Sequence, residues 1–356
     1  MSAALHVSLL QRRSFAGQFS IEGIAAHLAR DLRAAGVDAC LHVAPVHSRG
    51  LGPRLAIARF ARAHQGDVTH ITGDITFAAP ALRAARTVVT FHDCEPLEWM
   101  RGPRREVLRR FWYDAPARHA AAVTADSAHT KARLLVHVPG LEPDKVHVVP
   151  NAVAPVFRPR PQPPREGPPV VLQVGTKHNK NVPRLLAALE GLDVVLHIVG
   201  PVDAALGADL ARRRIRHRVF QDLTETALAE CYAAADVVAF ASLAEGFGMP
   251  VIEAQAMGRP VVTSRTTSLP EVAGAGAHFV DPQNVGDIRA ALVRVLGDAC
   301  WRARLVEAGF ANARRFTRER VVALYGALYR DLAEAAGPAA AYGRRSPPHP
   351  PPREAR

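Results

Sequence analysis

The sequence has few cysteines, few lysines and no long apolar run. Its cysteines are far apart and form no Cys-x-x-Cys pair: Cys40, Cys94, Cys231 and Cys300. This spacing argues against a disulfide scaffold or a zinc site and fits a reducing cytoplasm. No apolar stretch reaches the roughly 18 residues of a transmembrane helix, so no membrane span is expected. At the N-terminus the arginines follow the apolar residues, which indicates a first strand and not a signal peptide.

Several nucleotide- and metal-binding motifs are absent as well. No Gly-x-Gly-x-x-Gly follows the first apolar segment, so a nicotinamide-dependent dehydrogenase is not expected. The phosphate-binding Gly-x4-Gly-Lys-Ser/Thr loop and the Gly-x-Ser-x-Gly elbow of hydrolases are also missing. Asp-x-Asp does not occur, and Asp93-Cys94-Glu95 comes nearest to it. The sequence therefore predicts no metal site and no metal-bound nucleotide.

The composition is that of a globular protein with an excess of arginine. Hydrophobic residues make up 48% of the 356 residues. At about 100–200 residues per domain, this length predicts roughly two domains. The net charge is +12, from 45 basic and 33 acidic residues. Such an excess suggests a polyanionic partner, which is a nucleic acid, an anionic membrane or a phosphorylated substrate. A GC-rich genome, which favours arginine codons, explains it equally well.

Short β-branched runs alternate with alanine-rich amphipathic segments, which predicts parallel sheets covered by helices on both faces. In the first half we expect one helix at Ser20–Ala35 and strands at Leu5–Leu10, Val68–Thr72, Thr87–Phe91, Ala122–Ala125 and Lys145–Val149. In the second half we expect strands at Val170–Val174, Val194–Val199, Val237–Ala241 and Pro260–Thr263. The helices of that half are predicted at Val182–Leu189, Leu228–Ala235, Val251–Met257, Val285–Leu296 and Arg318–Ala336.

A proline-rich segment divides these two α/β halves. We predict a first domain over residues 1–156, a stiff linker over 157–169 and a second domain over 170–315. A helix over 316–336 is expected to pack back towards the first domain, and the Pro/Arg-rich residues 337–356 are expected to be disordered. Ligands of such sheets bind at the carboxyl ends of the strands, so the cleft between the halves is the predicted site.

The most informative segment is Ser242–Val272. A strand ends just before it, a loop with two glycines follows, Pro250 suits the first turn of a helix, and Gly258 ends that helix. A glycine-rich loop that opens a helix directs backbone N–H groups at one point, which suits a phosphate or a sugar hydroxyl. Glu245 in the loop and Glu253 in the helix are then placed to address two parts of one ligand. The alternative is an ordinary turn with solvated carboxylates.

The whole segment resembles glycosyltransferase family 4, through Glu-Gly-Phe-Gly-Met-Pro-Val-Ile-Glu-Ala, Gly-Arg-Pro-Val-Val-Thr-Ser and Ser-Leu-Pro-Glu-Val. The likeness extends over most of the chain, through Val174–Asn181, Asp222–Asp236, Thr90–Asp93 and Asn151–Val153. It implies a retaining enzyme that uses nucleotide sugars, with a GT-B fold of two facing Rossmann-like parallel-sheet domains and a cleft between them.

The resemblance also implies roles for individual residues. Lys180 would neutralise the departing diphosphate, Glu253 would bind the ribose hydroxyls, and Glu245 would lie beside the transferred sugar. The other predicted donor-binding residues are Gly175, Thr176, Lys177, Gly246, Phe247, Gly248 and Met249. Many family members carry an arginine where Thr176 stands, so Lys177 is the candidate for the missing second cation. Lys180 alternatively is a surface lysine at the start of a helix.

On the acceptor side the resemblance implies His92, Asp93 and the glycine-rich loop represented by Gly17. His92 would reach across the cleft towards the sugar as a catalytic residue with Lys180 and Glu245. Outside its Thr-Phe-His-Asp context, His92 would be one ordinary histidine among 16.

The implied activity is transfer of a sugar from a GDP-, UDP- or ADP-linked donor to a saccharide or polyprenyl-linked saccharide in cell-surface polysaccharide synthesis. No other cofactor, no metal and no nucleic-acid partner is expected. Two alternatives remain: a GT-B protein that binds without catalysis, and a GT-B epimerase or phosphorylase, against which the Glu-Gly-Phe-Gly loop argues.

Arg101–Tyr113 mixes five arginines with aromatic residues. Such a segment suits the surface of an anionic membrane, and equally a helix with a solvated arginine face and a buried aromatic face. The first interpretation predicts a cytoplasmic protein that associates peripherally with the inner face of a membrane.

Overall fold

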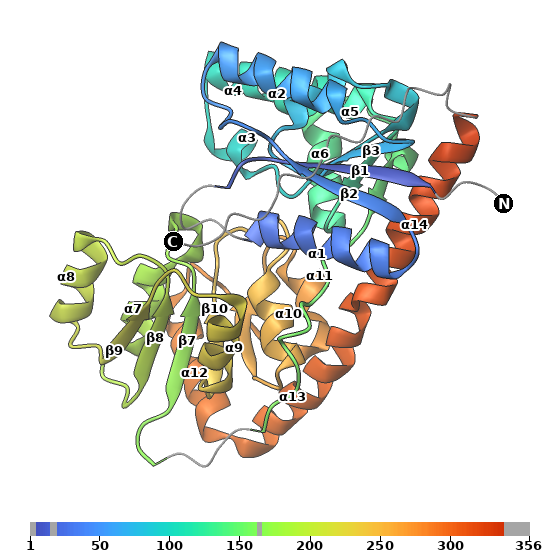
Figure 1. The fold of residues 1–356 in the computed structure, drawn as a ribbon. Helices are drawn as coiled ribbons and strands as arrows, with labels where there is room; N and C mark the ends of the chain where they lie inside the picture. Colours follow the sequence, from blue (N-terminus) through green and yellow to red (C-terminus); the bar gives the residue numbers. More distant parts are fainter. Residues whose placement is uncertain (1–4, 15–19, 162–165, 338–356) are drawn as a thin grey trace, which may run out of the picture.

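The computed structural model describes residues 5–14, 20–161 and 166–337, and the side chains of 20–22 are not described. Two parallel six-stranded sheets, each covered by helices, lie one above the other (Figure 1). This is the predicted GT-B arrangement. No helix in the described ranges is both long and apolar enough to cross a bilayer.

The first sheet has the strand order β2-β1-β3-β4-β5-β6, and the second has β12-β11-β10-β7-β8-β9. In each sheet the strand order reverses once, beside β1 in the first and beside β7 in the second. A crevice opens at such a reversal, at the carboxyl ends of the strands. The strands of the first sheet are β1 His6–Gln11, β2 Asp38–Val43, β3 Val68–Ile71, β4 Thr87–Phe91, β5 Ala122–Ala125 and β6 Val146–Val148. Those of the second are β7 Val170–Val174, β8 Val195–Val199, β9 His217–Phe220, β10 Val237–Phe240, β11 Val261–Ser264 and β12 Ala277–Val280.

Helices cover both faces of each sheet. The first half contains α1 Ser20–Ala34, α2 Leu51–Ala63, α3 Glu95–Trp99, α4 Pro103–Leu108, α5 Ala115–His119 and α6 Ala128–His137. The second half contains α7 Val182–Leu189, α8 Ala204–Arg212, α9 Glu225–Ala233, α10 Met249–Ala256, α11 Leu269–Ala273, α12 Val285–Gly297 and α13 Ala299–Ala313. The described parts of 157–169, which join the halves, contain no helix or strand.

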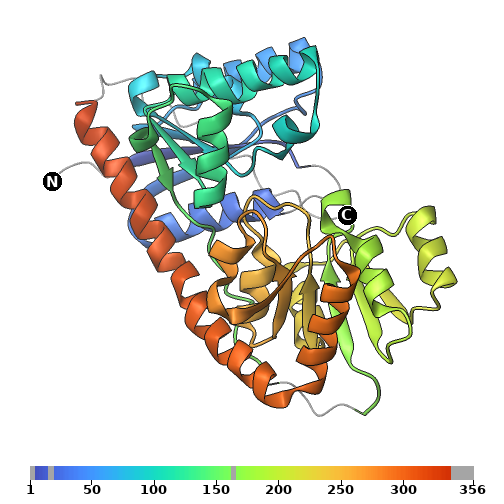
Figure 2. The ribbon, with the colours of Figure 1, turned by 180° about the vertical axis from the view of Figure 1, so that it is seen from behind.

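The last helix, α14 (Arg318–Ala335), leaves the second half and runs along the first (Figure 2). Tyr329 is fully buried there, and its hydroxyl lies 2.7 Å from Nδ1 of His70 in β3. The other nitrogen of His70 lies 2.6 Å from the Thr90 hydroxyl in β4. Helix α14 therefore stabilises the sheet whose strand β4 leads into the cleft.

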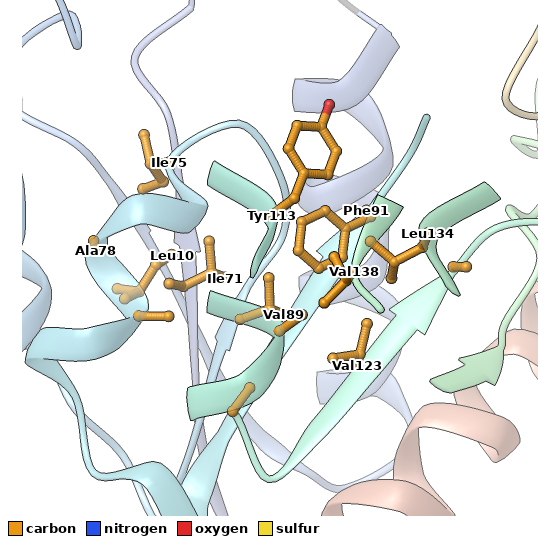
Figure 3. Packing of buried hydrophobic residues seen from close by; sticks show 14 of the residues in the cluster. Leu10, Ile71, Ile75, Ala78, Val89, Phe91, Tyr113, Val123, Leu134 and Val138 are labelled. Carbon is orange, nitrogen blue, oxygen red and sulfur yellow. The ribbon is translucent and has the colours of Figure 1, made fainter. Parts of the chain in front are cut away.

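One core of the first half fills the opposite face of this sheet. Leu10, Ile71, Val89 and Val123 are fully buried between the strands and the helices above them (Figure 3). Tyr113 stacks on Phe91, with ring centroids 5.4 Å apart. The end of the Arg101–Tyr113 segment is therefore part of the core.

Most predicted elements appear, and β4, β5, β7 and α7 have the predicted bounds residue for residue. The edge strands β2, β9 and β12 were not predicted. An edge strand has only one neighbour and tolerates polar residues, so β2 (Asp-Ala-Cys-Leu-His-Val) and β9 (His-Arg-Val-Phe) lack a continuous apolar run. No range was predicted for helices α2, α3, α5, α6, α8, α11 and α13 either.

Candidate active site

Two loops meet at the strand reversal of the second sheet. One follows β7 and contains Gly175 to Lys180, and the other follows β10 and leads into α10. Asn179 ties them together, because its amide donates to the Ala244 carbonyl at 3.0 Å and its own carbonyl accepts from the Leu243 N–H at 2.8 Å. Asn181 adds a bond to the Ala241 carbonyl at 2.9 Å. Sequence reasoning quoted these asparagines only as part of a motif, and their role is to hold the loops in register.

Lys180 and Glu245 form an ion pair between these loops, with Nζ and Oε1 2.6 Å apart. Both side chains are largely buried, at 17% and 11% exposure, and Nζ also lies 4.6 Å from the centre of the Phe240 ring. Gly175 has φ +86°, and a Cβ there would lie 3.0 Å from Cε of Lys180. The predicted donor residues therefore converge, and glycine leaves the space that the lysine occupies.

The start of α10 carries no side-chain cap. Gly248 takes the N-cap position with φ +108°, and Pro250 occupies the first turn. The backbone N–H groups of this turn lie at the positive end of the helix dipole, where an anion is stabilised. The Phe247 side chain packs on Phe316 in a small core, with ring centroids 5.7 Å apart, so this residue offers a ligand only its backbone. Met249, the first residue of the helix, is half-buried.

Glu253 lies one turn further into α10 and is 8% exposed. The Tyr232 hydroxyl donates to its Oε2 at 2.6 Å. Burial raises the pKa of Glu253 to about 7, although the tyrosine hydrogen bond acts in the opposite direction. One oxygen of this carboxylate thus has a fixed donor, and the other is left for a ligand hydroxyl.

The two other residues of the β7 loop behave differently from Lys180. The Thr176 hydroxyl donates to the Pro201 carbonyl at 2.7 Å and so fixes the loop. Lys177 is exposed and has no partner within the described part of the chain. Lys177 lies three residues before Lys180, but it takes no part in the Lys180–Glu245 ion pair.

In the first half, His92 directly follows β4 and faces groups of its own domain. Its Nε2 lies 2.8 Å from the Thr72 carbonyl, and its Nδ1 lies 3.4 Å from Oδ2 of Asp126. A carbonyl and a carboxylate only accept, so both ring nitrogens are placed to donate. Burial alone would lower the pKa of His92, but the hydrogen bond and charge of Asp126 outweigh it and raise that pKa. In this structure His92 is held by groups of its own domain, and its reach across the cleft stays a prediction.

Asp93 lies beside His92, and burial raises its pKa to about 6. Asn151 donates to Asp126 at 3.3 Å, which links the segment that closes the first half to the histidine. Sequence reasoning missed Asp126, because an Ala-Asp-Ser run after a strand shows no sign of its histidine partner. The predicted acceptor residue Gly17 lies outside the described residues.

The two halves touch at the glycine-rich loop. A Cβ on Gly246 would lie 1.9 Å from the His92 carbonyl oxygen, so only glycine permits this approach. The Gly246 carbonyl accepts from the hydroxyls of Ser127, at 2.6 Å, and Thr130, at 3.1 Å. Glu271 of α11 accepts from the Ala128 N–H at 2.8 Å, at the start of α6. These cross-domain bonds were not predicted.

Two family models match successive parts of the chain. "Glycosyltransferase Family 4" matches residues 24–157, and "Glycosyl transferases group 1" matches residues 168–298. The first match contains strands β2 to β6 of the first sheet, and the second contains the whole second sheet. The chain belongs to glycosyltransferase family 4.

Curated relatives of this family 4 chain include mannosyltransferases. The O-antigen chain mannosyltransferase B of Escherichia coli is 43% identical over 88 residues, which are 25% of this chain and 23% of the relative. The MMP alpha-(1->4)-mannosyltransferase of Mycolicibacterium hassiacum is 33% identical over 204 residues, 53% of this chain and 49% of the relative. The matches thus span at most about half the length of these two relatives.

Solved structures show the same fold over nearly the whole chain. Sucrose-phosphate synthase from Thermosynechococcus elongatus has a TM-score of 0.78 at 17% identity, covering 93% of this chain and all of that one. Anabaena HepE, solved with UDP and glucose, has a TM-score of 0.72 at 16% identity and covers 92% and 100%. At these identities the likeness establishes the family's GT-B fold alone.

Proposed function

We propose that this protein transfers a sugar from a nucleotide-diphosphate donor to a saccharide or lipid-linked saccharide, with retention of configuration. The observation that carries this proposal is the convergence of Lys180, Glu245 and the uncapped start of α10 at one strand reversal. A cation and free backbone N–H groups suit a diphosphate, and a neighbouring carboxylate suits sugar hydroxyls.

In this proposal the donor lies along the second half. Glu253 accepts hydrogen bonds from the ribose, with its carboxylate oriented by Tyr232. The diphosphate replaces Glu245 as the ion-pair partner of Lys180, and the Glu245 carboxylate then accepts hydrogen bonds from the sugar hydroxyls. The ion pair at 2.6 Å holds both groups in place before the donor arrives. Such preorganised groups stabilise developing charge without moving during the reaction.

Transfer breaks the bond between the anomeric carbon and the diphosphate oxygen. The acceptor oxygen forms a new bond to that carbon on the same face, and the acceptor proton leaves with the diphosphate. Lys180 and the α10 N–H groups meet the negative charge of the leaving group. We therefore expect transfer to proceed without a divalent cation.

A mannosyl unit is our first choice for the transferred sugar, because the two curated relatives above are mannosyltransferases. The O-antigen relative also favours a role in cell-surface polysaccharide synthesis. The alternatives, a non-catalytic GT-B protein or an epimerase or phosphorylase, predict different products: none, an altered donor, or a sugar phosphate.

The test has two stages. Thermal shift with UDP, GDP and ADP in EDTA identifies the base, because a ligand that binds the folded state raises its stability. Mannose and glucose donors of that base are then incubated with saccharide acceptors, and the anomeric configuration of the product is determined by NMR. Binding without transfer would favour the non-catalytic alternative, and a requirement for Mg²⁺ or Mn²⁺ would refute this account of the leaving group.

The basic aromatic segment supports a second part of the proposal, peripheral membrane contact. Trp99, Val107 and Phe111 are 48%, 54% and 53% exposed. Arg104 and Arg110 lie exposed along the same stretch of chain. Exposed aromatic and aliphatic side chains beside arginines suit the interface of an anionic bilayer. We propose that this surface brings the enzyme to a lipid-linked acceptor.

A further inference from the structure

Helix α3 extends from the first half to the donor loop of the second. It follows β4 after only three residues, and Cys94 and Leu97 anchor it in the core at 3% and 0% exposure. At its far end the Trp99 ring meets the His178 ring edge-on, with centroids 5.3 Å apart. This short helix therefore contacts both halves of the molecule, and its first residue is Glu95.

The carboxylate of Glu95 has no hydrogen-bond or ion-pair partner within the described part of the chain. Only its backbone N–H is bonded, to Asp93 Oδ1 at 3.2 Å. The side chain is nevertheless half-buried. Burial and the charges of Asp93, Glu245 and Glu98 raise the pKa of Glu95 to about 7, and Lys180 opposes them. Glu95 thus lies close enough to the Lys180–Glu245 pair for their charges to act on it.

A carboxylate in this position calls for a ligand that donates hydrogen bonds without adding negative charge. Lys180 is engaged by Glu245, and in the proposed reaction by the diphosphate. A chelated metal fits poorly, because the side chains of the cleft are too far apart. Across the described residues, the one group of three potential ligands within 4.8 Å of one another is His6, Asp38 and Cys40. Those residues lie on β1 and β2, at the opposite ends of the strands from the cleft.

We propose that Glu95 binds a hydroxyl group of the saccharide acceptor. The inference rests on the proposed function and specifies its acceptor side. Glu95 belongs to the first half, and its helix contacts the β7 loop of the second half through Trp99 and His178, so its carboxylate is placed beside the proposed donor site. An ionised carboxylate accepts hydrogen bonds from hydroxyls, and such charge-assisted bonds are roughly twice as strong as neutral ones. A sugar that lacks the matching hydroxyl would leave this carboxylate unpaired and would be rejected.

The experiment measures glycoside binding to the full chain saturated with the nucleoside diphosphate that stabilises it most. The probes are the methyl α-glycosides of mannose, glucose and galactose, titrated by calorimetry. Removing a hydrogen bond to a charged group weakens binding about 10- to 100-fold, so Glu95→Gln should raise the dissociation constant of the preferred glycoside by that factor. Glu98→Gln is the matched control, since Glu98 lies on the same helix but pairs with Arg133.

The pH dependence supplies a second readout that a purely structural role would not change. A carboxylate with a pKa near 7 accepts from hydroxyls better once ionised, so glycoside affinity of the wild type should rise between pH 6 and pH 8. The Glu95→Gln protein should show no such rise.

Equal glycoside affinity and equal pH profiles in wild type and Glu95→Gln would overturn the inference. Loss of nucleotide affinity in Glu95→Gln would overturn it too, because Glu95 would then act on the donor side through Lys180. Failure of the proposed function looks different, since the wild-type protein would then bind none of the three nucleoside diphosphates or would bind one of them without transferring a sugar.

Discussion

The two halves share one architecture but position their functional side chains in different ways. In the second half, Lys180, Glu245 and Glu253 come from two neighbouring loops and one helix, and the first two touch at 2.6 Å. In the first half, His92 is bound to Thr72 and Asp126, which follow strands of its own sheet, while the Glu95 carboxylate has no partner among the described residues. In the proposed reaction the donor side is thus preorganised, whereas the acceptor side offers a carboxylate that gains its partner only when the ligand binds.

The difference follows from what each half binds in the proposed reaction. A diphosphate needs backbone N–H groups and one cation, which a glycine-rich loop and a helix start supply from a short stretch of sequence. An acceptor hydroxyl needs a single carboxylate at the right point, and any element that borders the cleft can carry it. The four predictions below test this comparison, beginning with the largest expected effect.

Removing the positive charge of Lys180 at the leaving group should cause the largest loss of rate. Loss of one group that stabilises transition-state charge costs about 10²–10³ in rate, so we expect Lys180→Ala to lower kcat by that factor. Lys177→Ala is the matched control, because Lys177 is exposed and lies in the same loop. Steady-state kinetics with both variants would decide which lysine serves the diphosphate. A larger loss of kcat in Lys177→Ala than in Lys180→Ala would show that Lys177 neutralises the leaving diphosphate.

Disrupting the contact between the halves should cause the second-largest loss of rate. A methyl group at Gly246 would lie 1.9 Å from the His92 carbonyl, so Gly246→Ala forces the loop away from the first half. A misplacement of about 1 Å at a reacting centre costs roughly 10²-fold in rate. We expect that loss in kcat with nucleotide affinity preserved. Gly207→Ala in α8 should be harmless, because its new Cβ would meet no atom closer than 3.9 Å. Unchanged kcat in Gly246→Ala would show that the halves do not need this contact.

The pH dependence of nucleotide binding tests Glu253. Its pKa is raised from 4.5 to about 7 in the unliganded protein, whereas ribose hydroxyls favour the ionised form. Nucleotide affinity should therefore rise by up to about tenfold between pH 6 and pH 8, and should stay flat in Glu253→Gln. Without nucleotide, the raised pKa of Glu253 means that the free energy of unfolding falls as the pH rises from about 4.5 to 7. This fall should be smaller in Glu253→Gln, where Asp93 and Glu95 still contribute through their own raised pKa values. If the nucleotide affinity of Glu253→Gln still rose between pH 6 and pH 8, the titrating group would be another residue.

Membrane contact should show the smallest effect per residue. Each arginine near an anionic surface contributes about 1 kcal/mol, screened within a Debye length. Arg104→Glu with Arg110→Glu should weaken co-sedimentation with phosphatidylserine vesicles at low salt and leave nucleotide binding unchanged. Arg105 and Arg109 are poor targets, because Arg105 donates to the Leu97 carbonyl at 2.7 Å and Arg109 pairs with Glu106 at 2.6 Å.

The control for this experiment is the same double change at Arg212 and Arg218 in the second half, both of which are exposed. If both double variants sediment like the wild type, the segment is a solvated helix face. The buried ring of Tyr113 shows that part of this alternative already holds.

The sequence by itself determined the parallel α/β halves and led to the proposed donor residues. Strand β7 and helix α7 could be predicted to the residue, because a fully buried strand and an amphipathic helix each have a clear apolar pattern. Lys180, Glu245 and Glu253 lie in one loop and one motif, where chain geometry leaves few alternatives and the family resemblance names their roles. Edge strands such as β9 lacked this pattern, since they bury only part of their residues.

The tertiary structure alone decided which side chains meet across long separations. Asp126 reaches His92 because β4 and β5 are neighbours in the sheet, and Glu271 reaches α6 only when the halves face each other. The hydrophobic pattern of the sequence does not predict such contacts, because each depends on the packing of elements more than 30 residues apart in the chain. The unpaired carboxylate of Glu95 belongs to the same class: its neighbours Lys180 and Glu245 come from the other half of the chain, and only folding brings their charges to it.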